Sequence, residues 1–352
     1  MTNNMGLFSF LTGKSTAYWA HLTVVEKTHL SADFAVFTLQ KNPKDQYNPT
    51  FIPGQYITLE IDLGGNKIRR SYSICGKAPD GFNIGVKRVN GGLMSNYLHD
   101  SLHKGNTIKA HIPEGNFTLN GAHTVCAFVA GSGITPIASM IEAFQEDKQF
   151  RVFYGIRYAT DLVFQDLINQ VKTTVYLSQE EKAGFKKGRL NYDALMEEFK
   201  ADLSILQRDV YLLCGPEDFM NEVERGLLFF GVPESKIKRE YFTPPVKEAH
   251  DGEAQQRIQG PVLIKATIDG RTHDVAYQSG KKSILEALEE AKLDPPYSCR
   301  GGVCSSCKAK VTEGKVSMRQ NFTLTDKEIE AGYILTCQAD ACTSQLSISF
   351  DE

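Results

Sequence analysis

The chain has 352 residues, of which 41% are hydrophobic and 23% are charged, and its formal net charge is −3. This length suits two or three domains, and the composition is that of an ordinary globular protein. The mild negative charge argues against nucleic acid or an anionic membrane as a main partner. No apolar run is as long as a bilayer-spanning helix requires, so we expect no membrane span.

The first residues, MTNNMGLFSFLTG, contain a short apolar patch with no preceding positive charge and no clear cleavage site. We therefore expect no signal peptide and a cytoplasmic location. Five of the eight cysteines crowd between positions 299 and 342. In a long chain without a secretion signal, such crowding indicates metal binding rather than a disulfide framework.

The first domain is expected over residues 18–122. Short runs with alternating polarity, separated by Gly, Pro and Asn, occur here, and clear examples lie at 55–61, 82–89 and 106–112. This pattern predicts a small antiparallel β-barrel.

A second domain is expected over residues 123–243. Its apolar runs predict buried strands at 125–130, 150–156, 174–178 and 209–214, and helical patterns follow at 136–145 and 216–231. Buried strands that alternate with helices predict a parallel sheet covered on both faces.

Residues 244–260 are polar, contain Pro and Gly and have no periodicity, which is typical of a linker. A third domain is expected over residues 261–352. It begins with two strand-like runs at 262–270 and 272–278, which favour a hairpin. Ser283 with Glu286, and Thr325 with Glu328, have the spacing of capping boxes at helix starts.

The third domain contains the most specific motif of the chain. Cys299, Cys304 and Cys307 have the C-x4-C-x2-C spacing of plant-type [2Fe–2S] ligation, and Cys337 is the distant fourth ligand. Glycines at 301 and 302 let the backbone wrap closely around the sulfur atoms. A structural zinc site is the alternative, but zinc sites usually add a second close pair of ligands, and none follows. We expect Cys342 to be a core thiol.

Residues 284–316 and 334–339 resemble a plant-type ferredoxin domain. The resemblance covers essentially all of residues 261–352. It implies an α+β, β-grasp-like fold that carries the cluster.

In the barrel region, the segment F-I-P-G-Q-Y at 51–56 precedes R-S-Y-S at 70–73. This combination resembles the flavin motif of the ferredoxin–NADP⁺ reductase superfamily. A guanidinium at Arg70 can grip a pyrophosphate, Tyr72 offers a flat face to the isoalloxazine, and the Ser73 hydroxyl can hydrogen-bond near flavin N5. Arg-x-Tyr-Ser alone is commonplace on a strand, so the order of motifs carries the inference.

The resemblance continues through G-V-K-R-V at 85–89, G-G-L-M-S at 91–95 and P-E-G-N-F at 113–117. It implies FAD rather than FMN as the flavin. Its expected contacts with the flavin cofactor are Arg70, Ser71, Tyr72, Ser73, Val86, Lys87, Gly92, Met94 and Ser95.

A nicotinamide site is expected where buried strands of the second domain end. The strand at 125–130 runs into G-S-G-I-T-P at 131–136, a Gly-rich turn that opens a helix and can bind a pyrophosphate. C-G-P at 214–216 ends another strand and resembles the superfamily motif whose Cys lies beside nicotinamide C4. An inert buried thiol is the alternative for Cys214. The expected nicotinamide contacts are Gly131, Thr135, Pro136, Arg157, Gly215 and Pro216.

Glu240 and Phe242 resemble the acidic and aromatic end of the superfamily's second domain, which packs near the flavin. Glu240 can stabilise reduced flavin or relay a proton to it, and a solvated Glu is the alternative. We expect Cys214, Glu240 and Ser73 to be the catalytic residues. Gln179 stands where many relatives carry an Arg for the NADPH 2′-phosphate, although Lys186, Lys187 and Arg189 can compensate. We therefore favour NADPH over NADH.

The module order resembles the reductase components of multicomponent oxygenases, those of phenylacetyl-CoA epoxidases among them. It implies an oxidoreductase that passes electrons from NADPH to FAD, to the [2Fe–2S] cluster and then to a partner. The implied partner is a diiron oxygenase, such as an acyl-CoA epoxidase. A desaturase or a hybrid-cluster protein is an alternative acceptor, and an electron carrier without efficient nicotinamide turnover is an alternative function.

Overall fold

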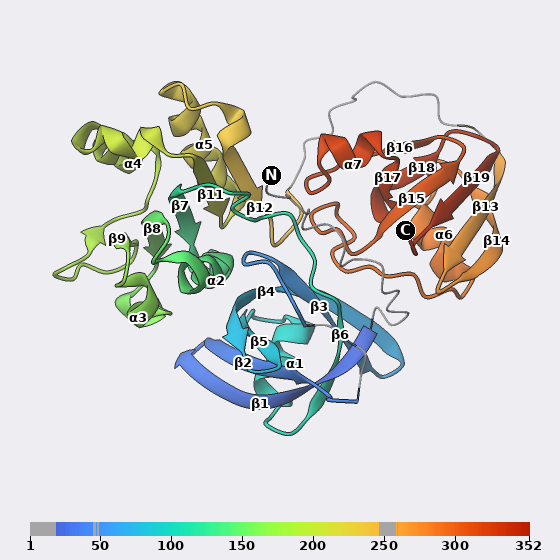
Figure 1. Cartoon of the computed structure of the whole chain (residues 1–352), viewed down its shortest axis with the longest axis horizontal. Coiled ribbons are helices and arrows are strands. Elements are labelled where there is room, and N and C mark those ends of the chain that lie inside the picture. Colours follow the sequence, from blue (N-terminus) through green and yellow to red (C-terminus); the bar gives the residue numbers. More distant parts are fainter. Residues whose placement is uncertain (1–18, 45–46, 48, 246–257, 259) are drawn as a thin grey trace, which may run out of the picture.

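The structure, a computed structural model, describes residues 19–44, 47, 49–245, 258 and 260–352. These residues form a barrel, a parallel sheet with helices, and a C-terminal mixed sheet (Figure 1). Most of the expected linker, namely residues 246–257 and 259, lies outside the described residues, as does the N-terminal segment 1–18. No helix in the described part of the chain is long and apolar enough to cross a membrane.

The N-terminal strands close into an antiparallel barrel, as predicted. Their order around the barrel is β1-β2-β5-β4-β3-β6. Alternate side chains point inward and form the core, and helix α1 adds Met94 and Leu98 to it. The elements are β1 (Trp19–Ser31), β2 (Phe34–Lys41), β3 (Tyr56–Leu63), β4 (Asn66–Ala78), β5 (Gly81–Lys87), α1 (Leu93–Asp100) and β6 (Thr107–His111).

The middle unit is a parallel sheet of six strands in the order β10-β9-β8-β7-β11-β12. Its strands are β7 (Thr124–Ala130), β8 (Gln149–Ile156), β9 (Lys172–Leu177), β10 (Lys186–Lys187), β11 (Val210–Cys214) and β12 (Ile237–Glu240). Its helices are α2 (Ile134–Phe144), α3 (Gln165–Ile168), α4 (Tyr192–Ala201) and α5 (Glu217–Phe229), with 3-10 turns η1 (Gly131–Gly133), η2 (Ala159–Asp161), η3 (Leu203–Gln207) and η4 (Glu234–Lys236).

Helices cover both faces of this sheet, which confirms the prediction. Val125 and Val129 of β7 pack in one core with α2, whereas Phe128 packs in a second core with α4 and α5. The period of two along β7 therefore supplies both cores from one strand.

The C-terminal unit is a mixed five-stranded sheet in the order β14-β13-β19-β15-β17, with a small pair β16-β18. The predicted hairpin is present, and both predicted capping boxes form at Ser283 and Thr325. The elements are β13 (Pro261–Ile268), β14 (Arg271–Gln278), α6 (Ile284–Glu290), β15 (Lys308–Glu313), β16 (Val316–Met318), α7 (Asp326–Glu330), β17 (Tyr333–Leu335), η5 (Thr336–Gln338), β18 (Ala339–Ala341) and β19 (Gln345–Ser349).

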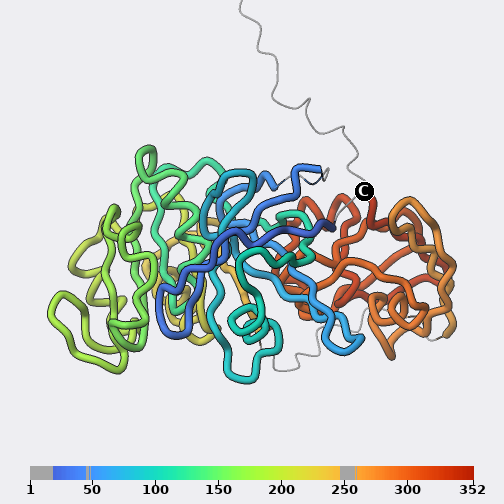
Figure 2. The backbone as a smooth tube through the Cα atoms, turned by 90° about the horizontal axis from the view of Figure 1, so that it is seen from below, coloured from blue at the N-terminus to red at the C-terminus, as the bar shows by residue number. Residues whose placement is uncertain are grey.

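The barrel lies between the other two units, as Figure 2 shows from below. On one side, α2 packs across β4 of the barrel. Gly85 of β5 makes this approach possible, because a Cβ atom there would collide with the methyl group of Thr135. On the other side, residues 298–307 of the C-terminal unit, here called the cysteine loop, face β3 and β4. The barrel is thus the common support of both neighbours.

Candidate functional site

A cavity of about 860 Å³ lies at the carboxyl ends of the parallel strands, on the side that borders the barrel. This is the edge at which open α/β sheets bind ligands. The residues of the sequence-based site that line it are Lys87, Gly131, Arg157, Gly215, Pro216 and Phe242. Thr135 and Pro136 are buried at the start of α2 and do not line it.

The Gly-rich turn forms part of the cavity wall. Residues Gly131–Gly133 make a 3-10 turn that leads directly into α2, so backbone N–H groups gather at a helix start. A Cβ atom on Gly133 would collide with the carbonyl oxygen of Cys214, so only glycine lets the turn pack against the end of β11. Thr135 donates a 2.9 Å hydrogen bond to the Ser132 carbonyl and so fixes the turn rather than reaching the cavity.

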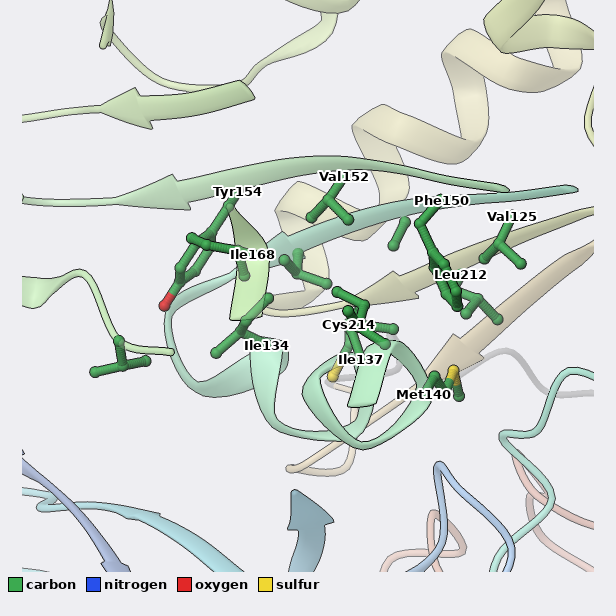
Figure 3. Close-up of a cluster of buried hydrophobic side chains, with 14 of the residues drawn as sticks. Val125, Ile134, Ile137, Met140, Phe150, Val152, Tyr154, Ile168, Leu212 and Cys214 are labelled. Atoms are coloured by element: carbon green, nitrogen blue, oxygen red, sulfur yellow. The ribbon is translucent and has the colours of Figure 1, made fainter. Parts of the chain in front are cut away.

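The three expected catalytic residues converge from two units. Ser73 of β4 lies 3.5 Å from Glu240 Oε2, and Cys214 Sγ lies 3.9 Å from the same oxygen. Cys214 is fully buried at the end of β11, next to the core beneath α2 (Figure 3). Parallel pairing of β11 with β12 places Cys214 opposite Glu240. The barrel then brings Ser73 to the shared carboxylate.

The electrostatics of this trio favour neutral side chains. Burial raises the pKa of Glu240 to about 8, and the hydrogen bonds from Ser73 and Cys214 only partly oppose this effect. Burial, together with the nearby Glu240 carboxylate, raises the pKa of Cys214 far above its usual value. A thiol that stays protonated is a poor nucleophile, so Cys214 is suited to pack against a ring rather than to form a covalent bond.

The flavin motif on β4 splits between two faces of the strand. Arg70 is exposed and makes no ion pair among the described residues, and its only direct bond in that part of the chain runs to the Arg69 carbonyl. Tyr72 is half-buried beside the barrel core. Ser71 points the other way, because its hydroxyl bonds to Thr58 and Ser298.

The remaining flavin candidates shape the barrel end. The side chains of Val86 and Met94 belong to the barrel core, so only their backbone can meet a ligand. The hydroxyl of Ser95 accepts the Val89 N–H at 3.1 Å. Gly92 caps α1 without a side-chain hydrogen bond and leaves N–H groups at the helix start open. An exposed guanidinium without an ion pair among the described residues, a tyrosine face and open N–H groups can together bind a flavin dinucleotide.

Four thiols gather in the C-terminal unit. Cys304 Sγ lies 3.1 Å from Cys299 Sγ, and hydrogen bonds from Cys304 and Cys337 lower the pKa of Cys299. Cys337 in η5 also lies beside Cys307, because Thr336 donates two hydrogen bonds to the Cys307 carbonyl. Thus all four expected ligands meet.

Backbone geometry around these thiols suits an iron–sulfur cluster. The N–H groups of Gly301 and Cys299 point at Cys299 Sγ and Cys304 Sγ, both at 3.4 Å, as expected for amides that stabilise negative sulfur. Among the described residues, no group of three or more His, Cys, Asp or Glu has the spacing of ligands to a single metal ion. Cys342 lies outside the set, with its thiol against the Asp340 carbonyl.

The cysteine loop is bonded directly to the barrel, a feature that the sequence did not reveal. Ser305 N–H donates to Tyr56 Oη at 2.8 Å, Thr58 and Ser306 share a 2.9 Å hydroxyl pair, and Ser71 reaches Ser298 at 2.9 Å. These partners are more than 220 positions apart in the chain. No local pattern could pair them. The serines between Cys304 and Cys307 were the only visible signal.

The segment that follows β12 in the middle unit also contacts the cysteine loop. A Cβ atom on Gly301 would collide with the ring of Pro244, so glycine is needed where the segment after β12 crosses the loop. The ring centroids of Tyr241 and Phe322 lie 5.4 Å apart. The cysteine loop is therefore in contact with both other units.

The raised pKa of Glu240 predicts a pH dependence. Below about pH 8 the Glu240 carboxyl is neutral, and above it a negative charge appears beside Ser73 and Cys214. We expect NADPH-driven flavin reduction to decline as the pH rises through about 8, measured by stopped-flow absorbance. The Glu240→Gln variant should lose this inflection. An unchanged inflection in Glu240→Gln would show that another group titrates.

The geometry of the cysteines predicts that the iron–sulfur cluster can be lost while the flavin stays bound. Cys304→Ser should lose the iron–sulfur signal and keep the flavin absorbance, because Cys304 takes no part in the barrel core. Cys342→Ser is the matched control and should retain both. Metal analysis and visible spectra check this, and an intact cluster in Cys304→Ser would refute the ligand set.

Family models match all three parts of the chain. An oxidoreductase FAD-binding domain covers residues 21–119, an oxidoreductase NAD-binding domain covers 128–225, and a 2Fe-2S iron-sulfur cluster binding domain covers 266–342. One component of the 1,2-phenylacetyl-CoA epoxidase of Escherichia coli (strain K12) is 29% identical over 347 residues, which is 94% of this chain and 97% of that protein. The glycine betaine monooxygenase reductase subunit of Pseudomonas aeruginosa (strain UCBPP-PA14) is 29% identical over 82% of this chain and 84% of its own.

Among solved structures, phthalate dioxygenase reductase matches with a TM-score of 0.58 and 22% identity, over 94% of this chain and 98% of its own. An intact type IV self-sufficient cytochrome P450 monooxygenase matches with a TM-score of 0.71 and 21% identity, over 94% of this chain and 41% of that one. These structures share the fold. As the sequence predicted, the chain carries an oxidoreductase FAD-binding domain, an oxidoreductase NAD-binding domain and a 2Fe-2S iron-sulfur cluster binding domain, in that order.

Proposed function

We propose that this chain takes electrons from NADPH and delivers them, through FAD and a [2Fe–2S] cluster, to a diiron oxygenase that acts on an acyl-CoA. When bound, the nicotinamide supplies a hydride, the flavin exchanges two electrons or one, and the cluster passes single electrons. The chain itself binds, orients and separates these groups. Reductase components of monooxygenases are among the relatives that it resembles over most of its length.

The observation that supports this direction of flow is the bonded contact between β3–β4 of the flavin barrel and the cysteine loop. Tyr56 and Ser71 join the strands that carry the flavin motif to Ser305 and Ser298 beside the ligands. Nothing comparable would be needed if the flavin alone reacted with the acceptor. A desaturase or a hybrid-cluster protein as acceptor would use the same route. The acyl-CoA oxygenase is favoured by the likeness to the epoxidase component.

The residue roles follow from the geometry. We assign Arg70 and the start of α1 to the pyrophosphate of FAD, and Tyr72 to the isoalloxazine face. We assign Cys214 to the nicotinamide end of the hydride site, and Glu240 Oε2 to holding a proton that Ser73 Oγ can share. We propose domain boundaries at 18–122, 123–243 and 261–352. We place the protein in the cytoplasm, where a reducing environment preserves the thiolates.

NADPH is the proposed donor because one cation of the basic stretch faces the cavity. Lys187 is paired with Glu181 at 2.6 Å, and Lys186 lies 3.8 Å from Glu198. Arg189 lines the cavity together with Tyr176 and Ser178 and makes no ion pair among the described residues. A guanidinium here can bind the 2′-phosphate in the role that Gln179 cannot fill.

The function is tested by adding NADPH to the purified protein without oxygen. We expect the flavin absorbance to bleach and the electron paramagnetic resonance signal of a reduced [2Fe–2S] cluster to appear. Failure of flavin bleaching would leave the electron-carrier alternative. Bleaching without cluster reduction would contradict the proposed route.

Arg189 should govern the choice of nucleotide. Arg189→Ala should raise the KM for NADPH about tenfold or more, because a charge-assisted hydrogen bond is lost, and should leave the KM for NADH unchanged. Lys187→Ala is the matched control, because Lys187 lies outside the cavity wall and is paired. Steady-state kinetics with both nucleotides decide it. An equal effect on NADPH and NADH would remove Arg189 from the 2′-phosphate site.

A further inference from the structure

A buried guanidinium lies where the flavin barrel meets the ferredoxin domain. Arg69 of β4 is only 1% exposed, and it has the largest side chain among the fully buried residues of the described chain. It precedes the flavin motif at 70–73 by one position. Burying a charge is costly unless it is paired, so the partners of Arg69 must hold it in place.

Within the barrel, Arg69 is anchored by Glu60. The Arg69 Nε–H donates to Glu60 Oε2 at 2.5 Å across the β3–β4 pair, in which these two residues are opposite each other. Lys109 of β6 donates to Glu60 Oε1 at 2.7 Å. Burial alone would raise the pKa of Glu60, but the bonds from Lys109 and Arg69 hold that pKa below its usual value. Two cations therefore face one carboxylate, and a positive charge is left over.

The second carboxylate comes from the ferredoxin domain. Arg69 Nη2 lies 2.7 Å from Asp294 Oδ1, and Nη1–H donates to the Pro295 carbonyl at 2.9 Å. The ring of Tyr297 lies 4.6 Å from the guanidinium carbon, and the barrel's own Trp19 lies 4.8 Å from it. The fork of Arg69 thus spans the two domains, and aromatic rings from both domains stack on it.

The contacts of Arg69 with the ferredoxin domain lie just before the cysteine loop in the chain. Residues 294–297 lead directly into Ser298 and the ligand Cys299. Ser298 is itself bonded to Ser71, two positions after Arg69 on the same strand. Two neighbouring contacts on β4, Arg69 with Asp294 and Ser71 with Ser298, therefore fix the position of the cysteine loop relative to this strand.

We infer that Arg69 is a positioning residue that fixes the cluster at its distance from the flavin, with Asp294 as its partner across the domain joint. This inference rests on the proposed route from flavin to cluster. The side chain of Arg69 bonds to none of the expected flavin contacts or cluster ligands, so hydride transfer into the flavin does not depend on it. Electron transfer from the flavin to the cluster does depend on Arg69. This transfer slows steeply with distance, so even a small displacement of the cluster lowers its rate.

The test uses the full chain with both cofactors bound. In Asp294→Asn, the pair of Arg69 with Glu60 remains and only the charge across the joint is lost. In Arg69→Met, the fork is replaced by an apolar chain of similar length, and Arg69→Lys keeps the charge without the fork. Lys67→Gln is the matched control, because it breaks only the exposed pair of Lys67 with the same Asp294.

Anaerobic stopped-flow spectroscopy with NADPH separates flavin reduction from cluster reduction. We expect Asp294→Asn and Arg69→Met to slow the flavin-to-cluster step about tenfold or more, with flavin reduction and both reduction potentials unchanged. Arg69→Lys should restore little of the rate, and Lys67→Gln should match the parent chain.

An unchanged flavin-to-cluster rate in Asp294→Asn, with the parent chain active, would overturn the inference alone. A shift of either reduction potential that accounts for the slower rate would also overturn it. Arg69 would then change the driving force for electron transfer rather than the distance between flavin and cluster. A parent chain in which NADPH reduces the flavin but never the cluster would overturn the proposed function and this inference together.

Discussion

The arrangement of the molecule depends on the packing of the cysteine loop against strands β3 and β4 of the barrel. The same two strands carry Tyr56, Arg70, Tyr72 and Ser73, so the flavin motif and the cluster ligands share one support. The Ser298 and Ser306 hydroxyls and the Ser305 N–H group have bonding partners across this joint. Because buried polar groups without partners are costly, separation of the domains would expose or orphan all of them.

A second constraint acts at the other side of the barrel. The cavity at the sheet edge is lined by Lys87 and Phe34 of the barrel as well as by residues at the ends of β7 and β8 and just after β11. Cys214 precedes Gly215 of the cavity wall, and beneath that wall Cys214 and Glu240 of paired strands meet Ser73 of the barrel. The barrel therefore presents one strand, β4, to both neighbours: Ser73 bonds to Glu240 of the middle unit, and Ser71 bonds to Ser298 of the C-terminal unit.

The sequence predicted the parts that local patterns encode. The alternation in 18–122 and the apolar runs of 123–243 predicted the barrel and the parallel sheet correctly. The cysteine spacing selected four thiols that the fold brings together. Capping boxes at Ser283 and Thr325 were visible because their partners are three residues away. Thr135 and Pro136 follow the family motif, yet they lie outside the cavity wall, because α2 turns them toward the barrel and its own core.

The contacts between domains could not be predicted in this way. Arg69 looks like a surface residue of an R-R-S-Y-S strand, and its burial depends on Asp294 and Tyr297, far along the chain. Likewise, Arg189 differs from Lys186 and Lys187 only in facing the cavity, and nothing in K-K-G-R distinguishes the three cations. Such pairings are properties of the assembled fold, whereas spacing motifs report only what one segment can do.

The central claim is that flavin and cluster exchange electrons within one chain across the β4 joint. The most direct measurement is the rate of cluster reduction after anaerobic mixing with excess NADPH, followed over a wide range of protein concentrations. The account predicts a first-order rate that does not change with protein concentration. A rate that rises in proportion to protein concentration would show that the cluster is reduced by another molecule, and it would contradict the account.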